Sequence, residues 1–318
     1  MPARDIAQTL PERLTEWIRP DTWLAQAWLH AQQHAGAPYI GRFAPSPSGK
    51  LHQGSLIAAL ASYLHAHWHG GTWLVRMEDV DQSRCTRATG AHQLATLRAL
   101  GFQFAEPVMW QSERFAAYRA AFAMLRAQQR VYPCICTRGQ IAERQAQLGV
   151  PHYPQTCRHG LASDAPIRSW RFALHDEVIE WADDWTDEWG PISTERLADS
   201  VGDFVIRRGS ETTDDWAYQL AVVVDDAAQG VTHVVRGADL FDSTARQIAL
   251  QRTLGYATPQ YSHVPLLTNA RGEKLSKSEQ APELDALNPL SALQHAWRFL
   301  GGQDFDCKHT SDFWRSVL

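Results

Sequence analysis

The sequence predicts an α/β protein whose core is a doubly wound parallel sheet. Short apolar segments typical of strands alternate with segments of helical periodicity over the first third of the chain and again after residue 230. Between these parts, from about residue 131 to residue 208, the pattern changes to cysteines, prolines, short β-like pieces and acidic residues. Alternating strands and helices favour a parallel sheet covered by helices, and the interruption indicates an inserted α+β domain.

The expected elements follow in chain order. Residues 1–38 mix charged residues with Trp and Leu at helical spacing, which predicts a helical extension packed on the core. Strands are expected at 39–44, 72–77 and 231–235, and helices at 54–68, 87–100, 115–128 and 242–254. The chain is thereby divided into the extension at 1–38, a core formed by 39–110 and 216–318, and an insert at 111–215.

The turn between the first expected strand and the first core helix is rich in Pro, Ser and Gly. It reads Arg-Phe-Ala-Pro-Ser-Pro-Ser-Gly-Lys-Leu-His-Gln-Gly-Ser at 42–55. Such a turn before a helix start presents backbone N–H groups, and here His52 as well, to a phosphate. Far downstream, Lys-Leu-Ser-Lys-Ser at 274–278 puts two lysines and two hydroxyls on one short loop, which suits the neutralisation of a polyphosphate.

In this order and spacing, the two segments resemble the HIGH and KMSKS signatures of class I aminoacyl-tRNA synthetases. The turn at 42–49 is similar to that of the glutamyl/glutaminyl branch of this family. Further matches to the same branch lie at 76–81, 218–226 and 230–239. The resemblance covers residues 39–278 and implies a Rossmann-type class I catalytic core, with the KMSKS-like loop in the second core segment.

The chain departs from the family pattern at two positions. Ser55 stands where the first signature has its second histidine, so His52 is the one imidazole left there. Leu275 stands where the second signature has methionine, which is a mild apolar change. About forty residues follow Ser278, too few for the helical anticodon-binding region of a full glutamyl-tRNA synthetase. We therefore expect no anticodon-binding domain.

The resemblance implies a ligase that activates L-glutamate with ATP as glutamyl-adenylate. Together with the short C-terminal region, it points to a catalytic-core paralogue that transfers glutamate to the queuosine base in the anticodon of tRNA(Asp). Two alternatives stay open. One is a truncated glutamyl-tRNA synthetase that charges the 3′ end of tRNA(Glu), and the other is a non-catalytic paralogue that binds glutamate or its adenylate.

The resemblance also implies roles for particular residues. The expected catalytic residues are His52, Lys274 and Lys277, and the expected ATP-binding residues are Pro45, His52, Gly54 and Lys277. The expected glutamate-binding residues are Arg42, Phe43, Ala44, Pro45, Ser46, Glu78, Tyr218 and Arg236. Guanidinium groups suit the carboxylates of glutamate and Glu78 suits its ammonium group. An ion pair between Glu78 and Arg236 is the competing structural interpretation. Mg²⁺ is expected with ATP, held mainly by phosphates and water.

The five cysteines are an odd number for a disulfide framework and fit a reducing compartment. A Cys-x-Cys pair at 134–136 and a third cysteine, Cys157, offer soft ligands for tetrahedral Zn²⁺, although unused thiols are the alternative. Chemistry alone suggests His152 or His159 as the fourth ligand. Related synthetases of this branch have Cys-x-Cys followed by Tyr-x-x-x-Cys, which implies Tyr153 instead. The expected structural zinc ligands are Cys134, Cys136, Tyr153 and Cys157.

The net charge of −5 argues against a protein that coats nucleic acid by charge alone, but a local basic face remains compatible with it. Candidate contacts to tRNA are Arg138, Arg144, Arg158, Arg168, Arg207 and Arg208. The sequence has no membrane span and no basic start followed by an apolar stretch, so no secretory signal is expected. We expect a cytoplasmic monomer with no membrane partner.

Overall fold

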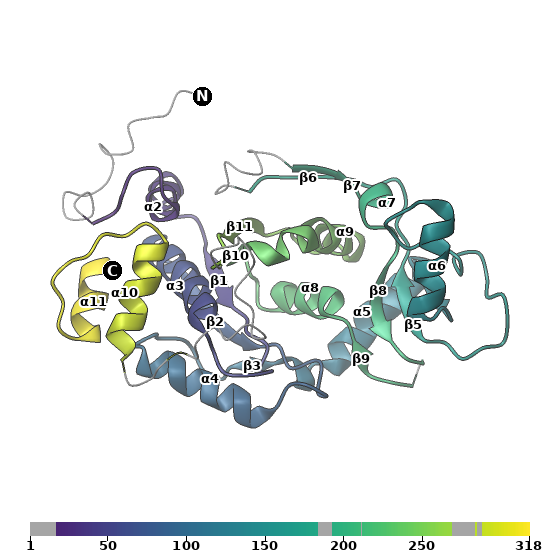
Figure 1. Ribbon diagram of the computed structural model, residues 1–318, viewed down its shortest axis with the longest axis horizontal. Coiled ribbons are helices and arrows are strands. Elements are labelled where there is room, and N and C mark those ends of the chain that lie inside the picture. Colours follow the sequence, from purple (N-terminus) through teal and green to yellow (C-terminus); the bar gives the residue numbers. More distant parts are fainter. Residues whose placement is uncertain (1–16, 184–192, 211, 269–283, 285–287) are drawn as a thin grey trace.

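The computed structural model describes residues 17–183, 193–210, 212–268, 284 and 288–318. The α/β core lies on the left of Figure 1 and the inserted part of the chain on the right. None of the helices in the described part of the chain combines the length and the apolar character that a membrane span requires.

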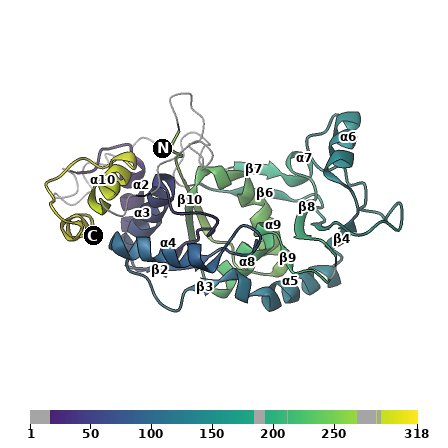
Figure 2. The same ribbon diagram turned by 60° about the horizontal axis from the view of Figure 1, so that its bottom comes forward.

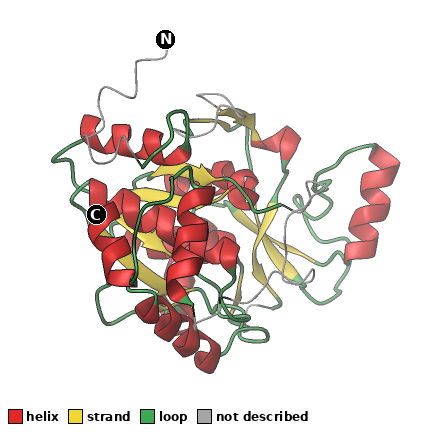
Figure 3. Cartoon of the chain, turned by 60° about the vertical axis from the view of Figure 1, so that its left-hand side comes forward, coloured by secondary structure: helices red, strands yellow, loops and turns green. Residues whose placement is uncertain are grey.

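The core is built on parallel strands. They are β1 (Ile40–Phe43), β2 (Thr72–Met77), β3 (Met109–Trp110), β10 (His233–Gly237) and β11 (Gln260–Val264). β1, β2 and β3 pair in that order, and β10 pairs with β11, all in parallel. The backbone N–H of Thr232 donates to the carbonyl of Ile40 (2.9 Å), which brings β10 alongside β1. The predicted parallel core is confirmed, and its strands lie among the helices of the core in Figure 3.

The four helices predicted from the sequence begin and end within two residues of the expected bounds. They are α3 (Gln53–Trp68), α4 (Arg87–Ala99), α5 (Phe115–Ala127) and α9 (Thr244–Leu254). The structure adds α8 (Tyr218–Ala228), α10 (Pro289–Phe299) and α11 (Thr310–Val317). Gly101 follows α4 with a φ of 89°, and an added Cβ would lie 2.4 Å from Trp314 Nε1. Glycine at this position therefore lets α11 pack against the end of α4.

The described part of the expected N-terminal extension contains one helix, α2 (Trp23–Gln33), which packs on α3. Trp17 and Ile18 lie before it and are not helical, although the sequence predicted a helical extension over residues 1–38. Ile18 instead forms an antiparallel bridge with Gly302 and is buried among the side chains of the core. Tertiary contact with the C-terminal region therefore decides the conformation at this position.

The insert contains an antiparallel sheet in the order β4 (Val131–Cys134), β5 (Ser169–Phe172), β8 (Phe204–Arg208) and β9 (Asp215–Trp216). α6 (Arg138–Leu148) lies on its outer side, at the end of the molecule (Figure 2). A hairpin of β6 (Val178–Trp181) and β7 (Ser193–Arg196), followed by the short α7 (Leu197–Ser200), reaches back toward α9. Phe172 and Trp216 share one hydrophobic cluster with Leu220 of α8 and Ile248 of α9, so the insert packs directly on the second half of the core.

Candidate active site

Hydrogen bonds from two other segments hold the turn that follows β1. The backbone N–H of Glu78, just after β2, donates to the carbonyl of Pro45 (3.0 Å). The side-chain amide of Gln93 on α4 donates to the carbonyls of Ser46 (3.2 Å) and Gly49 (2.7 Å). The turn is thus fixed at the carboxyl edge of the parallel sheet, which is where ligands bind in doubly wound folds.

His52 is the N-cap residue of α3. Its Nδ1 accepts a hydrogen bond from the backbone N–H of Ser55 (3.3 Å). Because a neutral imidazole has one donor and one acceptor nitrogen, this bond leaves the proton on Nε2. His52 can therefore donate from Nε2 to an anion at the helix N-terminus, while Ser55 contributes a backbone group to the cap.

A pocket of about 330 Å³ lies over this turn. Residues that line it include Pro45, Ser46, Lys50, His52 and Gly54 on one side and Asp239 and Leu266 on the other. An added Cβ at Gly54 would lie 3.1 Å from His52 Cε1, so glycine leaves room for the imidazole. The structure thus brings together the expected ATP-binding residues Pro45, His52 and Gly54. Lys274 and Lys277 lie outside the described residues.

A smaller pocket of about 130 Å³ adjoins the first and shares Phe43, Ala58, Gly237 and Leu240 with it. It is lined by six of the expected glutamate-binding residues, namely Arg42, Phe43, Ala44, Glu78, Tyr218 and Arg236. The two remaining ones, Pro45 and Ser46, line the larger pocket. With two guanidinium groups and one carboxylate, the charged side chains of the small pocket sum to +1, which complements an acidic amino acid of net charge −1.

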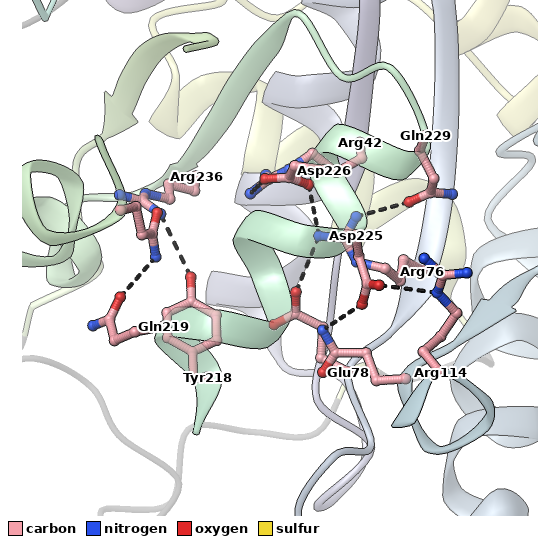
Figure 4. A network of polar contacts seen from close by, with 12 residues as sticks. Arg42, Arg76, Glu78, Arg114, Tyr218, Gln219, Asp225, Asp226, Gln229 and Arg236 are labelled. Carbon is pink, nitrogen blue, oxygen red and sulfur yellow. Dashed lines mark hydrogen bonds and ion pairs between the residues drawn. The ribbon is translucent and has the colours of Figure 1, made fainter. Parts of the chain in front are cut away.

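The charged groups behind this pocket form a buried network (Figure 4). Arg42 Nε lies 3.2 Å and Arg76 Nη2 lies 2.8 Å from Asp226 Oδ1. Arg76 Nη2 also lies 3.2 Å from Glu78 Oε1. Glu78 thus forms an ion pair with Arg76 instead of the structural ion pair with Arg236 that the sequence left open. Burial alone would raise the pKa of Asp226, but Arg42 and Arg76 outweigh it and lower that pKa. Burial raises the pKa of the Glu78 carboxyl against the opposing effect of Arg76 and Arg42.

Arg236 is held by its own set of partners. Its guanidinium donates to Gln247 Oε1 (2.7 Å), Thr244 Oγ1 (2.7 Å), the carbonyl of Leu240 (3.1 Å) and His263 Nε2 (3.1 Å). Its Nη1 lies 3.5 Å from the Tyr218 hydroxyl at the pocket wall. Because His263 accepts at Nε2, it is neutral and directs its Nδ1–H to the buried carboxylate of Asp183. The arginine is thereby fixed before any ligand binds.

A third pocket of about 290 Å³ shares Ala44, Glu78 and Tyr218 with the small pocket. It is also lined by the charged residues Asp81, Arg84 and Arg208 and by the buried Trp216. Arg208 Nη2 lies 3.8 Å from Asp81 Oδ2, and the Arg208 side chain is half-exposed. A basic group therefore lies where this pocket meets the surface. Arg207, a candidate tRNA contact, is instead buried, with its guanidinium 4.7 Å from the ring centroid of Trp216. It stabilises the insert.

Several residues of the network were not found by reasoning from the sequence. Asp225 and Asp226 have no role among the residues expected from the sequence, although both are buried on α8. Asp225 accepts from the Tyr118 hydroxyl (2.6 Å) and pairs with Arg114 (3.0 Å). Arg76 had no assigned role, although it lies in one of the segments that carry the family resemblance. Both Arg76 and Asp226 lie in segments that match the family. Their ion pair, however, joins positions 150 residues apart, so neither segment alone predicts it.

The expected metal ligands gather at the end of β4. The three thiols of Cys134, Cys136 and Cys157 lie within 4.8 Å of one another. The Tyr153 hydroxyl lies 3.3 Å from Cys134 Sγ and 3.9 Å from Cys136 Sγ. The Sγ atoms of Cys136 and Cys157 are 3.5 Å apart, which is far beyond a disulfide bond. Three sulfurs and one phenolic oxygen fit a closed tetrahedral site, and within the described residues no histidine joins this group.

Residues 40–286 match the family described as tRNA synthetases class I (E and Q), catalytic domain. A protein of Janthinobacterium named glutamyl-Q tRNA(Asp) synthetase is 49% identical to this chain over 288 residues, which cover 88% of the chain and 95% of the relative. A Burkholderia mallei protein of the same name is 52% identical over 267 residues, which cover 83% of the chain and 88% of the relative.

The fold is also similar to solved synthetase structures. The crystal structure of glutamate-tRNA synthetase from Elizabethkingia anophelis superimposes with a TM-score of 0.65 at 24% identity, over 76% of this chain and 53% of that one. This chain thus spans about half the length of that synthetase. At this identity the likeness supports the fold, and the relatives of about 50% identity establish the family. The chain therefore belongs to the class I glutamyl and glutaminyl tRNA synthetase family and, within it, to the glutamyl-Q tRNA(Asp) synthetases.

Proposed function

We propose that the protein activates L-glutamate with ATP and transfers it to the queuosine base in the anticodon of tRNA(Asp). As a member of its family it is a ligase of the aminoacyl-tRNA synthetase type. The observation that carries the proposal is the series of three adjoining pockets, with a positively charged small pocket between a phosphate-binding turn and an outer pocket. The names of the relatives support the choice of acceptor. ATP, glutamate and tRNA meet in the cytoplasm, which is the location that we propose.

In the first step, the α-carboxylate of glutamate attacks the α-phosphorus of ATP and displaces pyrophosphate. The attacking carboxylate is already ionised, so the site needs no general base and acts by positioning and by charge neutralisation. His52 Nε2–H donates to the phosphates, and Arg42, Tyr218 and Arg236 hold the amino acid while Glu78 meets its ammonium group. Lys274 and Lys277 are proposed to bind the leaving phosphates by family position, with Mg²⁺ bound mainly by phosphates and water.

In the second step, a hydroxyl of the acceptor nucleoside attacks the glutamyl carbonyl and releases AMP. We assign the third pocket to this nucleoside, because it opens next to Ala44 and Tyr218 and ends at a half-exposed arginine, Arg208. A guanidinium at the opening suits a tRNA phosphate. The alternative acceptor, the 3′ end of tRNA(Glu), is distinguished by where the label is found on the tRNA.

The first experiment is glutamate-dependent ATP–pyrophosphate exchange, with and without tRNA. We expect exchange without any tRNA, since the chain itself supplies all of the expected glutamate-binding residues to two adjoining pockets. Exchange that requires tRNA(Glu) would favour the truncated synthetase. No exchange under either condition, in protein that binds glutamate, would leave the non-catalytic alternative.

Replacing His52 by asparagine is expected to lower the rate of adenylate formation by roughly 100-fold, because the shorter amide does not extend as far toward the phosphates as the imidazole Nε2–H and one lost donor to a developing anion usually costs about this much. Asparagine retains an oxygen that accepts from the Ser55 N–H, and it is a favoured N-cap residue, so α3 should remain intact. Pre-steady-state pyrophosphate release measures the effect, and the melting temperature controls for folding. An unchanged rate in the folded variant would remove His52 from the mechanism.

We propose that Cys134, Cys136, Tyr153 and Cys157 bind one structural Zn²⁺. Four protein ligands leave no open position, so the ion would hold β4 to the following loop and take no part in catalysis. In cobalt-substituted protein, we expect thiolate-to-cobalt charge-transfer absorption that Cys157→Ser abolishes and Tyr153→Phe weakens. Cys307→Ser, a partly buried thiol elsewhere, should leave it unchanged. Loss of the band in His159→Gln would show that His159, and not Tyr153, is the fourth ligand.

A further inference from the structure

A cluster of histidines lies on the opposite edge of the core from the active-site turn. We call it the histidine cluster. Its members are His30 on α2, His34 at the C-cap of α2, His65 on α3, His69 at the C-cap of α3, and His233 at the start of β10. Tyr39, which precedes β1, stacks on His233 with ring centroids 4.1 Å apart. All of these residues sit at the amino ends of the strands, so the cluster is separate from the adenylate-forming site.

Three imidazoles converge in this cluster. One ring nitrogen from each of His30, His65 and His69 lies within 4.8 Å of the other two. His30 Nδ1 is 2.9 Å from His69 Nε2. Nitrogens around a tetrahedral zinc ion lie about 3.4 Å apart, given Zn–N bonds of about 2.0–2.1 Å. The separations in the cluster, from 2.9 Å to at most 4.8 Å, span the value for a three-histidine metal site.

Hydrogen bonds on the far side of the rings fix their orientation. His69 Nδ1 lies 2.7 Å from the carbonyl of His65, and His34 Nδ1 lies 2.9 Å from the carbonyl of His30. A carbonyl only accepts, so both rings carry their proton on Nδ1 and have a lone pair on Nε2. His65 Nδ1 lies 2.6 Å from the Tyr39 hydroxyl. Metal-bound histidines typically have such a partner on their other nitrogen.

The cluster is also accessible. A pocket of about 550 Å³ is lined by His34, Tyr39, His69 and His233 and opens to the surface beside them. The side chains of His65 and His69 are 1% and 7% exposed, whereas His30 is half-buried. Of the three converging rings, His69 lines the pocket, so an ion would reach the site at His69, with a water molecule or His34 as its fourth ligand.

We propose that His30, His65 and His69 bind a divalent transition-metal ion of the zinc, nickel or cobalt type, at a site distinct from the three cysteines. Neutral imidazoles are preferred ligands of these ions. The ion would replace the hydrogen bond between His30 and His69 and join α2 to the end of α3. Because neither α2 nor the C-terminal end of α3 lines any of the three active-site pockets, we expect the ion to stabilise the N-terminal part of the core without changing adenylate chemistry.

The test uses the full-length protein, stripped of metal with a chelator and then loaded with Ni²⁺ or Co²⁺. We expect one equivalent bound by nitrogen and oxygen atoms alone, seen by X-ray absorption as an imidazole shell, in addition to the ion bound by the thiolates. His30→Gln and His69→Gln should each lose this equivalent and keep the thiolate-to-cobalt band. His92→Gln, an exposed histidine on α4, is the control and should keep both.

His30 is only half-buried, so His30→Gln should fold normally even if replacing the buried His69 impairs folding. The metal content of His30→Gln therefore decides whether the cluster binds an ion. Equal metal content in wild type and His30→Gln would overturn the proposal, and so would an absorption spectrum that contains sulfur ligands only. In that case the cluster is a set of packed, hydrogen-bonded rings that join α2 to α3.

Discussion

Replacing Arg236 by lysine is expected to lower glutamate-dependent ATP–pyrophosphate exchange by about 100- to 1,000-fold, or about 3–4 kcal/mol. The guanidinium reaches Gln247, Thr244, the Leu240 carbonyl and His263 at once. An ammonium group keeps the charge but cannot reproduce this planar fork, so the group that faces the amino acid loses its position. Steady-state exchange at varied glutamate and varied ATP measures the effect.

The loss should appear mainly as a higher KM for glutamate, with the KM for ATP nearly unchanged, because Arg236 lines the small pocket and not the larger one. Arg119→Lys is the matched control, since Arg119 is 54% exposed and pairs with Asp214 on the insert. A KM for glutamate equal to that of the control would contradict the role of Arg236 in recognising the amino acid.

Replacing Asp226 by asparagine is expected to lower the free energy of unfolding by about 3–5 kcal/mol. Asp226 is 3% exposed and faces two buried arginines, Arg42 and Arg76. Asparagine has nearly the same shape but no charge, so both ion pairs at position 226 are lost while Arg76 keeps its pair with Glu78. Urea denaturation followed by fluorescence measures the loss. Asp304→Asn, in a surface pair with Arg298, should cost less than about 1 kcal/mol.

The effect of Asp226→Asn should also depend on pH. The arginines lower the pKa of Asp226 in the folded protein. Its contribution to stability is therefore complete above the pKa of an unfolded aspartate, about 3.9, and is lost as the pH falls through the lower folded value. The difference between wild type and variant should shrink in acid below about pH 4. A difference that is constant with pH would show that Asp226 acts through packing and not through its charge.

Local patterns were sufficient to predict much of the fold. The strand at 72–77 and the helices α3 to α5 have clear apolar periodicity and clear ends, and their bounds were predicted within one residue. β10 begins two residues later than expected because Val231 extends the apolar run before the strand pairs. α8 was not predicted, since its Ala-Val-Val-Val run at 221–224 favours a strand by propensity. Burial against α5, α9 and the insert overrides that preference.

The expected glutamate-binding residues follow from the family resemblance, since residue type and spacing alone left a structural ion pair open for Glu78 and Arg236. The turn at 42–55, Glu78, Tyr218 and Arg236 do line adjoining pockets. The groups that hold them, such as Asp226 and His263, come from distant positions and ordinary sequence contexts. A single sequence contains no signal for such long-range pairs. Cys134, Cys136 and Cys157 were singled out because they are close in sequence, and Tyr153 because of the family resemblance. The histidine cluster joins three separate elements and has no such local signal.

The most direct test of the proposed function compares two forms of one acceptor. Purified protein is given ATP, labelled glutamate and tRNA(Asp) that carries either queuosine or guanosine at position 34, and nuclease mapping locates the label. We predict label on the queuosine-containing anticodon alone. Equal labelling of both forms, or label at the 3′ end, would contradict the proposal.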